Sequence, residues 1–100
     1  MSATTALPDP ALAVRELGKL RWRCRRGLLE NDLLIERFFA RHEHTLTRTQ
    51  ADALMQLMDL SDNDLLDLLL RRKEPEPGSS LDTPGVHNVL TLLRPPVLHP

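Results

Sequence analysis

The sequence predicts an all-α protein, a small compact bundle of about five short helices. Leucine dominates the hydrophobic residues, which make up 41% of the chain, and 27% of residues are charged, as is typical of globular domains. Aromatic residues reach only 3%, tyrosine is absent, and β-branched residues are sparse away from the ends, which favours helix over sheet. Apolar residues also recur at the three- and four-residue steps of a helical face. A chain of 100 residues has room for one domain.

Two amphipathic segments open the predicted helical region. The first helix is expected from Ala11 to about Arg25. Its apolar face is formed by residues three or four apart, namely Ala13, Leu17, Leu20 and Cys24. The second helix is expected to begin after Gly27 and to end near His44, with a wider apolar stripe. The glycine thus interrupts what would otherwise continue as one helix.

Start signals mark the three remaining helices. Each has a Ser or Thr as N-cap and a second favourable residue in the first turn, in the pairs Thr47 with Gln50, Ser61 with Asp64, and Thr83 with Pro84. Three basic residues, 71–73, are expected at the negative C-terminal end of the fourth helix. Proline and glycine make 74–85 a loop, which we expect to be mobile. The short connections between the first four helices favour antiparallel neighbours.

The ends of the chain differ from its centre. Residues 1–10 are expected to be a flexible N-terminal segment, 11–94 a single helical domain, and 95–100 a flexible C-terminal tail. The first residues lack the basic start and apolar stretch of a signal peptide, and no stretch approaches the roughly 20 apolar residues of a membrane span. A single cysteine forms no internal disulfide. We therefore expect a monomer in the bacterial cytoplasm, without membrane insertion.

Charge is unevenly distributed along a chain whose net charge is −1. Basic residues gather in the first helix and just after it, at Arg15, Lys19, Arg21, Arg23, Arg25 and Arg26, whereas Asp59, Asp62, Asp64 and Asp67 form an acidic block. The basic cluster and Trp22 leave open a second hypothesis, a basic helical domain that binds nucleic acid. The near-neutral total charge, the acidic block and the single aromatic residue in the cluster argue against nucleic acid as a partner.

Residue types that often form reactive sites occur without a supporting pattern. His42 and His44 are two residues apart, so on a helix they point in nearly opposite directions, and we expect no metal site. Cys24 lies on the predicted apolar face, where a free cysteine usually behaves as a small hydrophobic residue. Phosphate loops and recognisable catalytic triads are lacking. We expect no enzymatic activity.

The stretch RWRCRRGLLEND, residues 21–32, places Gly27 between Arg26 and Glu30. An ion pair between residues four apart on a helix contributes only about 0.2 to 0.5 kcal/mol, whereas glycine inside a helix costs about 1 kcal/mol relative to alanine. Stability therefore does not explain the glycine. It indicates either a bend between two helices or a surface that a partner approaches closely. Both interpretations leave Arg26 and Glu30 exposed.

The longer stretch RWRCRRGLLENDLLIERFF resembles the signature of the small succinate dehydrogenase assembly factors of the SdhE type, whose motif is Arg-Gly-x-x-Glu. The motif is matched by Arg26, Gly27 and Glu30. The resemblance runs from about Leu20 to Leu70 and also includes Trp22, Arg25, Asp32, Phe38, Phe39 and the later stretch LSDNDLLDLL. Two positions depart from the common family pattern, with Leu66 in place of a tryptophan and Glu43 in place of a tyrosine.

The resemblance implies a chaperone-like helper with an all-α fold that assists covalent attachment of FAD to the flavoprotein subunit of succinate dehydrogenase, and in bacteria also of fumarate reductase. FAD would be the cofactor attached to the partner, and no tightly bound cofactor is expected in the helper. The residues implied in partner binding are Trp22, Arg23, Arg25, Arg26, Gly27, Glu30 and Asp32. Among them, Arg26 and Glu30 would be a docking pair, Gly27 the gap for close approach, and Trp22 an anchor. Direct contact of the helper with FAD is left open.

Overall fold

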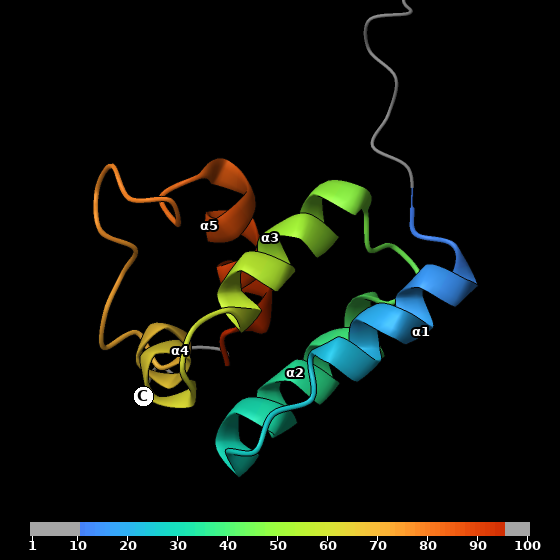
Figure 1. Ribbon diagram of the computed structural model, residues 1–100, viewed down its shortest axis with the longest axis horizontal. Helices are drawn as coiled ribbons and strands as arrows, with labels where there is room; N and C mark the ends of the chain where they lie inside the picture. The colour runs from blue at the N-terminus through green and yellow to red at the C-terminus, as the bar shows by residue number, and fades with distance from the viewer. Residues whose placement is uncertain (1–10, 96–100) are drawn as a thin grey trace, which may run out of the picture.

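The computed structural model describes residues 11–95, which contain five helices (Figure 1). In chain order they are α1 (Val14–Arg23), α2 (Leu29–His42), α3 (Arg48–Met58), α4 (Asp62–Leu69) and α5 (Pro84–Leu93). Within these residues the only β-type pairing is an isolated bridge between Ala11 and Thr47. The prediction of an all-α fold with about five short helices is confirmed.

The predicted start signals of the last three helices are present. Thr47 and Gln50 form a capping box, in which the Thr47 side chain accepts from the Gln50 backbone and the Gln50 side chain accepts from the Thr47 backbone. Ser61 caps α4 by accepting from the Asp64 N–H at 3.2 Å. Thr83 caps α5 in the same way, with proline at the first helical position. Each cap satisfies a backbone N–H that the first turn leaves without a helical acceptor.

The first two helices are shorter than predicted. α1 begins at Val14 because Ala13 has an extended backbone, and Ala13 is exposed rather than part of the buried stripe. The helix ends at Arg23, and α2 ends at His42. Neither α1 nor α2 has a side-chain hydrogen bond at its N-cap, so these starts lack the local signal that fixes α3, α4 and α5.

The hydrophobic core joins all five helices. α3 and α5 pack closely against each other, and α2 contacts both α4 and α5. Phe38 and Phe39 of α2 are both buried, with their rings edge to face at 5.4 Å between centroids. The predicted inner face of α5 is fully buried, at Val86, Val89, Leu90 and Leu93. Cys24 is completely buried, which confirms its prediction as a core residue.

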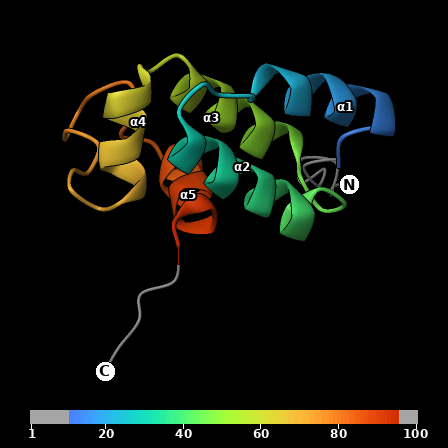
Figure 2. The same cartoon turned by 90° about the horizontal axis from the view of Figure 1, so that it is seen from below.

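The helix α1 runs antiparallel to α2 and lies on the side of the molecule away from α4, whereas α2 contacts α4 (Figures 1 and 2). Arg21 of α1 connects them by donating to Glu43 at 2.8 Å and to Glu36 at 3.3 Å. Its guanidinium also lies over the Phe39 ring, 5.4 Å from the centroid. Glu43, a departure from the common family pattern, thus supports the packing of α1 on α2.

The connection 70–83 leaves α4 through a left-handed residue, Arg71, at φ 63°. The Arg72 N–H donates to the Asp67 carbonyl at 2.9 Å, which closes a Schellman-type turn. The three basic residues predicted at the end of α4 therefore follow the helix rather than forming its last turn. The expected loop is present before α5.

The two ends of the chain were predicted to differ from the helical domain. The proposed flexible segments 1–10 and 96–100 lie outside the described residues. Within 11–95, the Leu12 N–H donates to the Leu46 carbonyl at 2.9 Å, and Arg71 donates to the Pro95 carbonyl at 2.9 Å. Both ends of the described chain are thus tied to the body. None of the described helices has the length and apolar character needed to cross a membrane.

Candidate functional site

Gly27 lies in the bend between α1 and α2 and is exposed. A Cβ atom added there would have one neighbour within 4 Å, the Asp62 Oδ2 at 3.9 Å, which is ordinary contact distance. Its φ is not in the left-handed region. Neither space nor backbone conformation within this chain therefore requires a glycine. Of the two predicted explanations, a bend is present, but the bend itself does not demand this residue.

Arg26 corrects one prediction, because its side chain is 15% exposed rather than fully exposed. Its guanidinium donates to three acceptors at 2.8 Å each, namely the Asp62 carboxylate and the carbonyls of Met58 and Leu60. The three acceptors all belong to the end of α3 and the start of α4. We call this arrangement the Arg26 clamp. It fixes the bend before α2 onto the connection between α3 and α4.

The acidic partner of the clamp is held from two sides. Asn31, fully buried in the first turn of α2, donates from Nδ2 to the Asp62 carbonyl at 2.9 Å. The hydrogen bond from Arg26 lowers the pKa of the Asp62 carboxyl below its ordinary value of 3.8, and Asn31 adds to the effect. Asp32 has a local role, since its carboxylate accepts from the Arg26 N–H at 3.2 Å. These contacts hold the motif in one conformation.

Glu30 is exposed in the first turn of α2, as predicted. Its side chain forms no hydrogen bond or ion pair with any other residue between 11 and 95. In particular, the pair with Arg26 considered from the sequence does not form, because Arg26 points toward Asp62. Gly27 and Glu30 are therefore both open to solvent beside a rigidly held arginine.

Three further residues implied in partner binding lie at the end of α1 or directly after it. The Trp22 side chain is 71% exposed, which is unusual for the largest apolar residue. The Arg25 guanidinium lies over the Trp22 ring, 5.5 Å from its centroid, and restrains the indole by a cation–π contact. Arg23 is exposed on the same helix. The exposure of these side chains makes them accessible to a partner.

Two leucines extend this surface and were missed from the sequence. Leu29 is 64% exposed and Leu33 is 59% exposed. They lie four residues apart, so both are on one face of α2, on either side of Glu30 in the chain. Large apolar side chains gathered on a surface often mark a protein interface. The sequence signal that could have found them is the helical repeat, which places both on the side of α2 away from the buried stripe.

Other reactive side chains are packed or solitary. Burial raises the pKa of the Cys24 thiol to about 12, so the thiol is not a nucleophile at neutral pH. His42 packs against Phe38, with ring centroids 5.4 Å apart, whereas the His44 side chain is 90% exposed. Across residues 11–95, no three His, Cys, Asp or Glu side chains are grouped as metal ligands.

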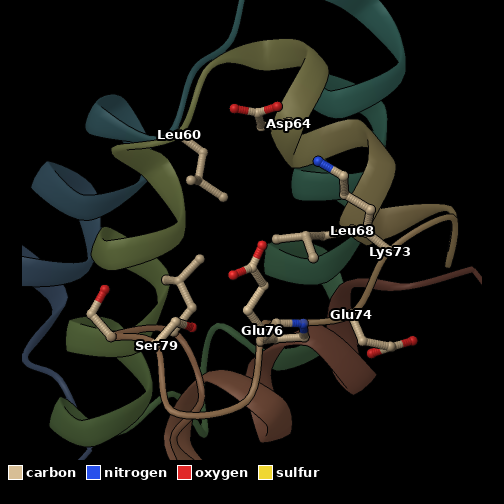
Figure 3. A pocket seen from close by; sticks show the side chains of 10 residues that line it. Leu60, Asp64, Leu68, Lys73, Glu74, Glu76 and Ser79 are labelled. Carbon is tan, nitrogen blue, oxygen red and sulfur yellow. The ribbon is translucent and has the colours of Figure 1, made fainter.

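A groove of about 380 Å³ lies elsewhere, between α4 and the segment 73–81 (Figure 3). Leu60, Leu68 and Leu81 supply its apolar lining, and charged side chains such as Asp64 and Lys73 also face it. None of the residues implied in partner binding lines this groove. Its one link to the motif is Leu60, whose carbonyl accepts from Arg26.

The comparisons with known proteins agree with the motif. A family model described as "Flavinator of succinate dehydrogenase" matches residues 18–92. The chain belongs to this family. The match to the flavinator family includes the whole segment from the second half of α1 through α4 and nearly all of α5. The site residues Trp22 to Asp32 lie inside it.

The curated relatives compared below are all named FAD assembly factors. The FAD assembly factor SdhE of Ralstonia nicotianae is 60% identical over 76 residues, which cover 76% of this chain and 78% of the relative. The FAD assembly factor SdhE of Coxiella burnetii is 45% identical over 58 residues, covering 58% and 71% respectively. That of Legionella pneumophila (strain Paris) is 42% identical over 62 residues, covering 62% and 78%. No solved structure matches the chain.

Proposed function

We propose that this protein binds the flavoprotein subunit of succinate dehydrogenase, and of fumarate reductase, and promotes covalent attachment of FAD to that subunit. One observation carries the proposal: Gly27 and Glu30 are both exposed, three residues apart at the start of α2, and nothing within the described structure explains either residue. A glycine that the fold does not need is consistent with close approach by a partner. The description of the family as a flavinator of succinate dehydrogenase supports the choice of partner, and the relatives named as FAD assembly factors support the choice of cofactor.

The docking surface in this proposal has an open gap and a ring of side chains around it. Gly27 provides the gap, Glu30 provides a carboxylate, and Trp22 with Leu29 and Leu33 provides apolar contacts. Aromatic and apolar anchors surrounded by polar groups are the usual basis of affinity in protein interfaces. Arg23 and Arg25 add exposed positive charge. Arg26 and Asp32 act from behind this surface as positioning residues, because their polar groups already bond within the chain.

The protein acts as a chaperone in this proposal, and not as the catalyst of the bond-forming step. The flavin and its own protein carry the chemistry of attachment. A helper that binds one conformation of the flavoprotein more tightly than the others raises the population of that conformation. To raise a conformer from 1% to about half of the population, the helper must bind it about 100-fold more tightly than the competing forms. We place this activity in the bacterial cytoplasm, with the helper as a monomer.

The test is reconstitution with purified apo-flavoprotein and FAD, with and without this protein. Covalent flavin is read by fluorescence of the denatured flavoprotein in a gel. We expect the protein to raise the rate of covalent attachment and to bind the apo-flavoprotein more tightly than the flavinylated form. Unchanged flavinylation in a strain that lacks this protein would contradict the proposal.

Glu30→Ala sharpens this test. Removing a docking carboxylate should weaken binding about tenfold, whereas the melting temperature should change little because the side chain is exposed. Glu76→Ala is the matched control, since Glu76 is exposed in the loop before α5, away from the motif. Equal binding by both variants would remove Glu30 from the docking surface.

Nucleic acid is the alternative partner raised by the basic cluster. Titration with duplex DNA or RNA at several salt concentrations distinguishes it, because phosphate binding by several arginines weakens steeply with salt. We expect only weak, non-specific association. Submicromolar binding with a steep salt dependence would favour the alternative over the flavoprotein.

A further inference from the structure

A second glycine without an internal explanation lies in the middle of α1. A Cβ atom added at Gly18 would meet nothing within 4 Å, and the residue is exposed. Glycine destabilises the interior of a helix relative to alanine, and α1 is only 10 residues long. The helix therefore keeps a destabilising residue at a position where the fold tolerates any side chain. This is the same situation as at Gly27.

Gly18 is the floor shared by two shallow hollows on the outer side of α1. The larger, of about 560 Å³, is lined by Val14, Arg15, Lys19, Trp22 and Arg23 in addition to Gly18. The smaller, of about 300 Å³, is lined by Gly18, Arg21, Trp22, Arg25 and Glu36. Val14 is 87% exposed and Trp22 is 71% exposed. Because Val14, Gly18 and Trp22 are spaced four residues apart, they share one face of α1. We call this the Gly18 face.

The Gly18 face carries more positive than negative charge, and Glu16 is close enough to Lys19 to interact with it electrostatically. Arg15, Lys19, Arg23 and Arg25 form no ion pair with any described residue. The nearby acids have other partners, since Glu16 pairs with Arg48, and Glu36 and Glu43 both pair with Arg21. An acidic ligand that binds here would therefore meet several cations around the exposed Trp22. Beside Trp22, the absence of a side chain at Gly18 leaves a small notch.

We propose that the Gly18 face receives an acidic segment of the flavoprotein, with one apolar side chain of that segment entering the notch beside Trp22. This inference rests on the proposed function and extends its docking surface from the motif along the whole of α1. The two surfaces are continuous: Arg25 lines the smaller hollow and directly precedes Arg26 and Gly27 in the chain. The positive charge of the face favours an acidic segment, and the notch at Gly18 has room for a side chain of that segment.

Two other anionic partners fit the face less well. Glu36, whose side chain is 59% exposed, forms part of the wall of the smaller hollow. A nucleic-acid strand or an anionic lipid surface presents a continuous row of negative charge, which would pass this carboxylate at a cost in repulsion. A protein segment can place its acids opposite Arg15 and Lys19 and leave a neutral residue opposite Glu36. Insertion into a lipid surface would also need a broader apolar face than Val14 and Trp22 provide.

The first test reverses one charge. We expect Lys19→Glu to weaken binding of the apo-flavoprotein about tenfold at about 50 mM salt and much less at about 500 mM, because salt screens exposed charges. Lys73→Glu is the matched control, since Lys73 is exposed after α4 and faces the groove between α4 and the segment 73–81, outside the Gly18 face (Figure 3). It should bind as the unmodified protein does. Equal affinities for the Lys19→Glu and Lys73→Glu variants at low salt would overturn the proposal.

The second test fills the notch. Gly18→Gln should weaken binding at both salt concentrations, since the added side chain occupies the place of the partner's side chain. Its melting temperature should rise or stay unchanged, because glutamine is a better helix former than glycine. Normal binding by a folded Gly18→Gln variant would contradict the proposal that a partner side chain enters the notch.

Different results would contradict the proposed function and the proposed role of the Gly18 face. If the unmodified protein does not bind the apo-flavoprotein at all, both the proposed function and this inference are wrong. If Gly27→Arg abolishes binding while Lys19→Glu and Gly18→Gln do not affect it, only this inference is wrong. Binding of phosphatidylglycerol vesicles or of RNA that depends on Lys19, while flavoprotein binding does not, would assign the face to that other anion and overturn the proposal as well.

Discussion

Arg26 and Arg94 are held in the same way at two distant places in the molecule. Each donates to two backbone carbonyls and one carboxylate, and the two side chains are 15% and 11% exposed. Arg94 donates to the Leu68 carbonyl and to the Glu74 carboxylate at 2.9 Å each, and to the Lys73 carbonyl at 3.4 Å. It connects the end of α5 to the end of α4 as Arg26 connects the α1–α2 bend to the start of α4. An arginine in a motif can thus be a structural clamp.

Two glycines, Gly27 beside the Arg26 clamp and Gly85 at the start of the helix that Arg94 ends, show a difference between the two regions. Gly85, in the first turn of α5, faces α3, and an added Cβ would lie 3.6 Å from the Ala53 Cβ and 3.8 Å from the Thr49 Cγ2. Both distances are ordinary contact, so a methyl group would fit at Gly85, but a longer side chain would meet α3, which packs closely against α5. At Gly27 the one atom within 4 Å of an added Cβ is the Asp62 Oδ2, at the end of a partly exposed side chain. Residues that the chain's own packing leaves unexplained mark the surface that we assign to a partner, and the glycine identifies it better than the arginine does.

The largest predicted effect separates the two glycines. Gly27→Arg should leave helicity and melting temperature near those of the unmodified protein, because the added side chain points into open space near Asp62. Binding of the apo-flavoprotein and stimulation of covalent FAD attachment should be lost. Circular dichroism and the flavinylation assay, run on the same samples, check both statements.

Gly85→Arg is the control for Gly27→Arg, and it should lower stability rather than binding. Forcing a side chain between α5 and α3 should cost about 1 to 3 kcal/mol in the free energy of unfolding. Flavinylation should fall only as far as the folded fraction falls. Normal flavinylation by a folded Gly27→Arg variant would refute the docking surface, and unfolding of that variant would make Gly27 a structural residue like Gly85.

The next effect concerns the two clamps. Arg26→Ala and Arg94→Ala should each lower the free energy of unfolding by about 1 to 3 kcal/mol, because each leaves the carbonyl of a buried residue, Met58 or Leu68, without its side-chain donor. For a domain of this size, the melting temperature should fall by on the order of 10 °C. Urea unfolding at fixed pH measures the difference. If Arg26→Ala abolished flavoprotein binding at full stability, Arg26 would be a docking residue after all.

A smaller effect is expected in acid. Because the Arg26 hydrogen bond lowers the pKa of Asp62, this carboxylate contributes stability that is fully present above its ordinary pKa of 3.8 and is lost as the pH falls toward the lowered value. Asp62→Asn should therefore lose less of its melting temperature than the unmodified protein between pH 5 and acid conditions. Asp59→Asn, on an exposed residue outside the clamp, should keep the acid sensitivity of the unmodified protein.

The smallest effect is expected at the two ends. Removing residues before Pro10 and after Pro95 should change the melting temperature little, because the contacts of Leu12 with Leu46 and of Arg71 with Pro95 are kept. Thermal unfolding of the shortened chain checks this. A large fall in melting temperature would show that one of the removed segments packs on the domain.

Features that depend on neighbouring residues could be predicted from the sequence. The starts of α3, α4 and α5 were predicted because Thr47, Ser61 and Thr83 each cap a helix by accepting from a residue only three positions further along the chain. The burial of Cys24 followed from its place in a helical repeat. The family resemblance also rested on a local pattern, the motif at 26–30, and the family match confirms it.

The Arg26 clamp could not be predicted, because it depends on residues that are far apart in the chain. The acceptors of Arg26 lie 32 to 36 residues further along the chain, and no local spacing indicates which of several exposed-looking arginines meets them. The exposure of Leu29 and Leu33 follows from the helical repeat, because at 3.6 residues per turn both lie on the side of α2 away from Ile35 and Phe38. The sequence analysis missed them because it considered only the buried stripe of α2.

Cys24 gives the α1–α2 bend a reporter of its own. The thiol is completely buried and burial raises its pKa to about 12, so an alkylating reagent at neutral pH reacts with it only when the end of α1 opens. Because it is the single cysteine of the chain, the labelling rate counts those openings without any added probe. The rate at which the bend next to Gly27 opens can therefore be measured directly, in the free protein and in its complex.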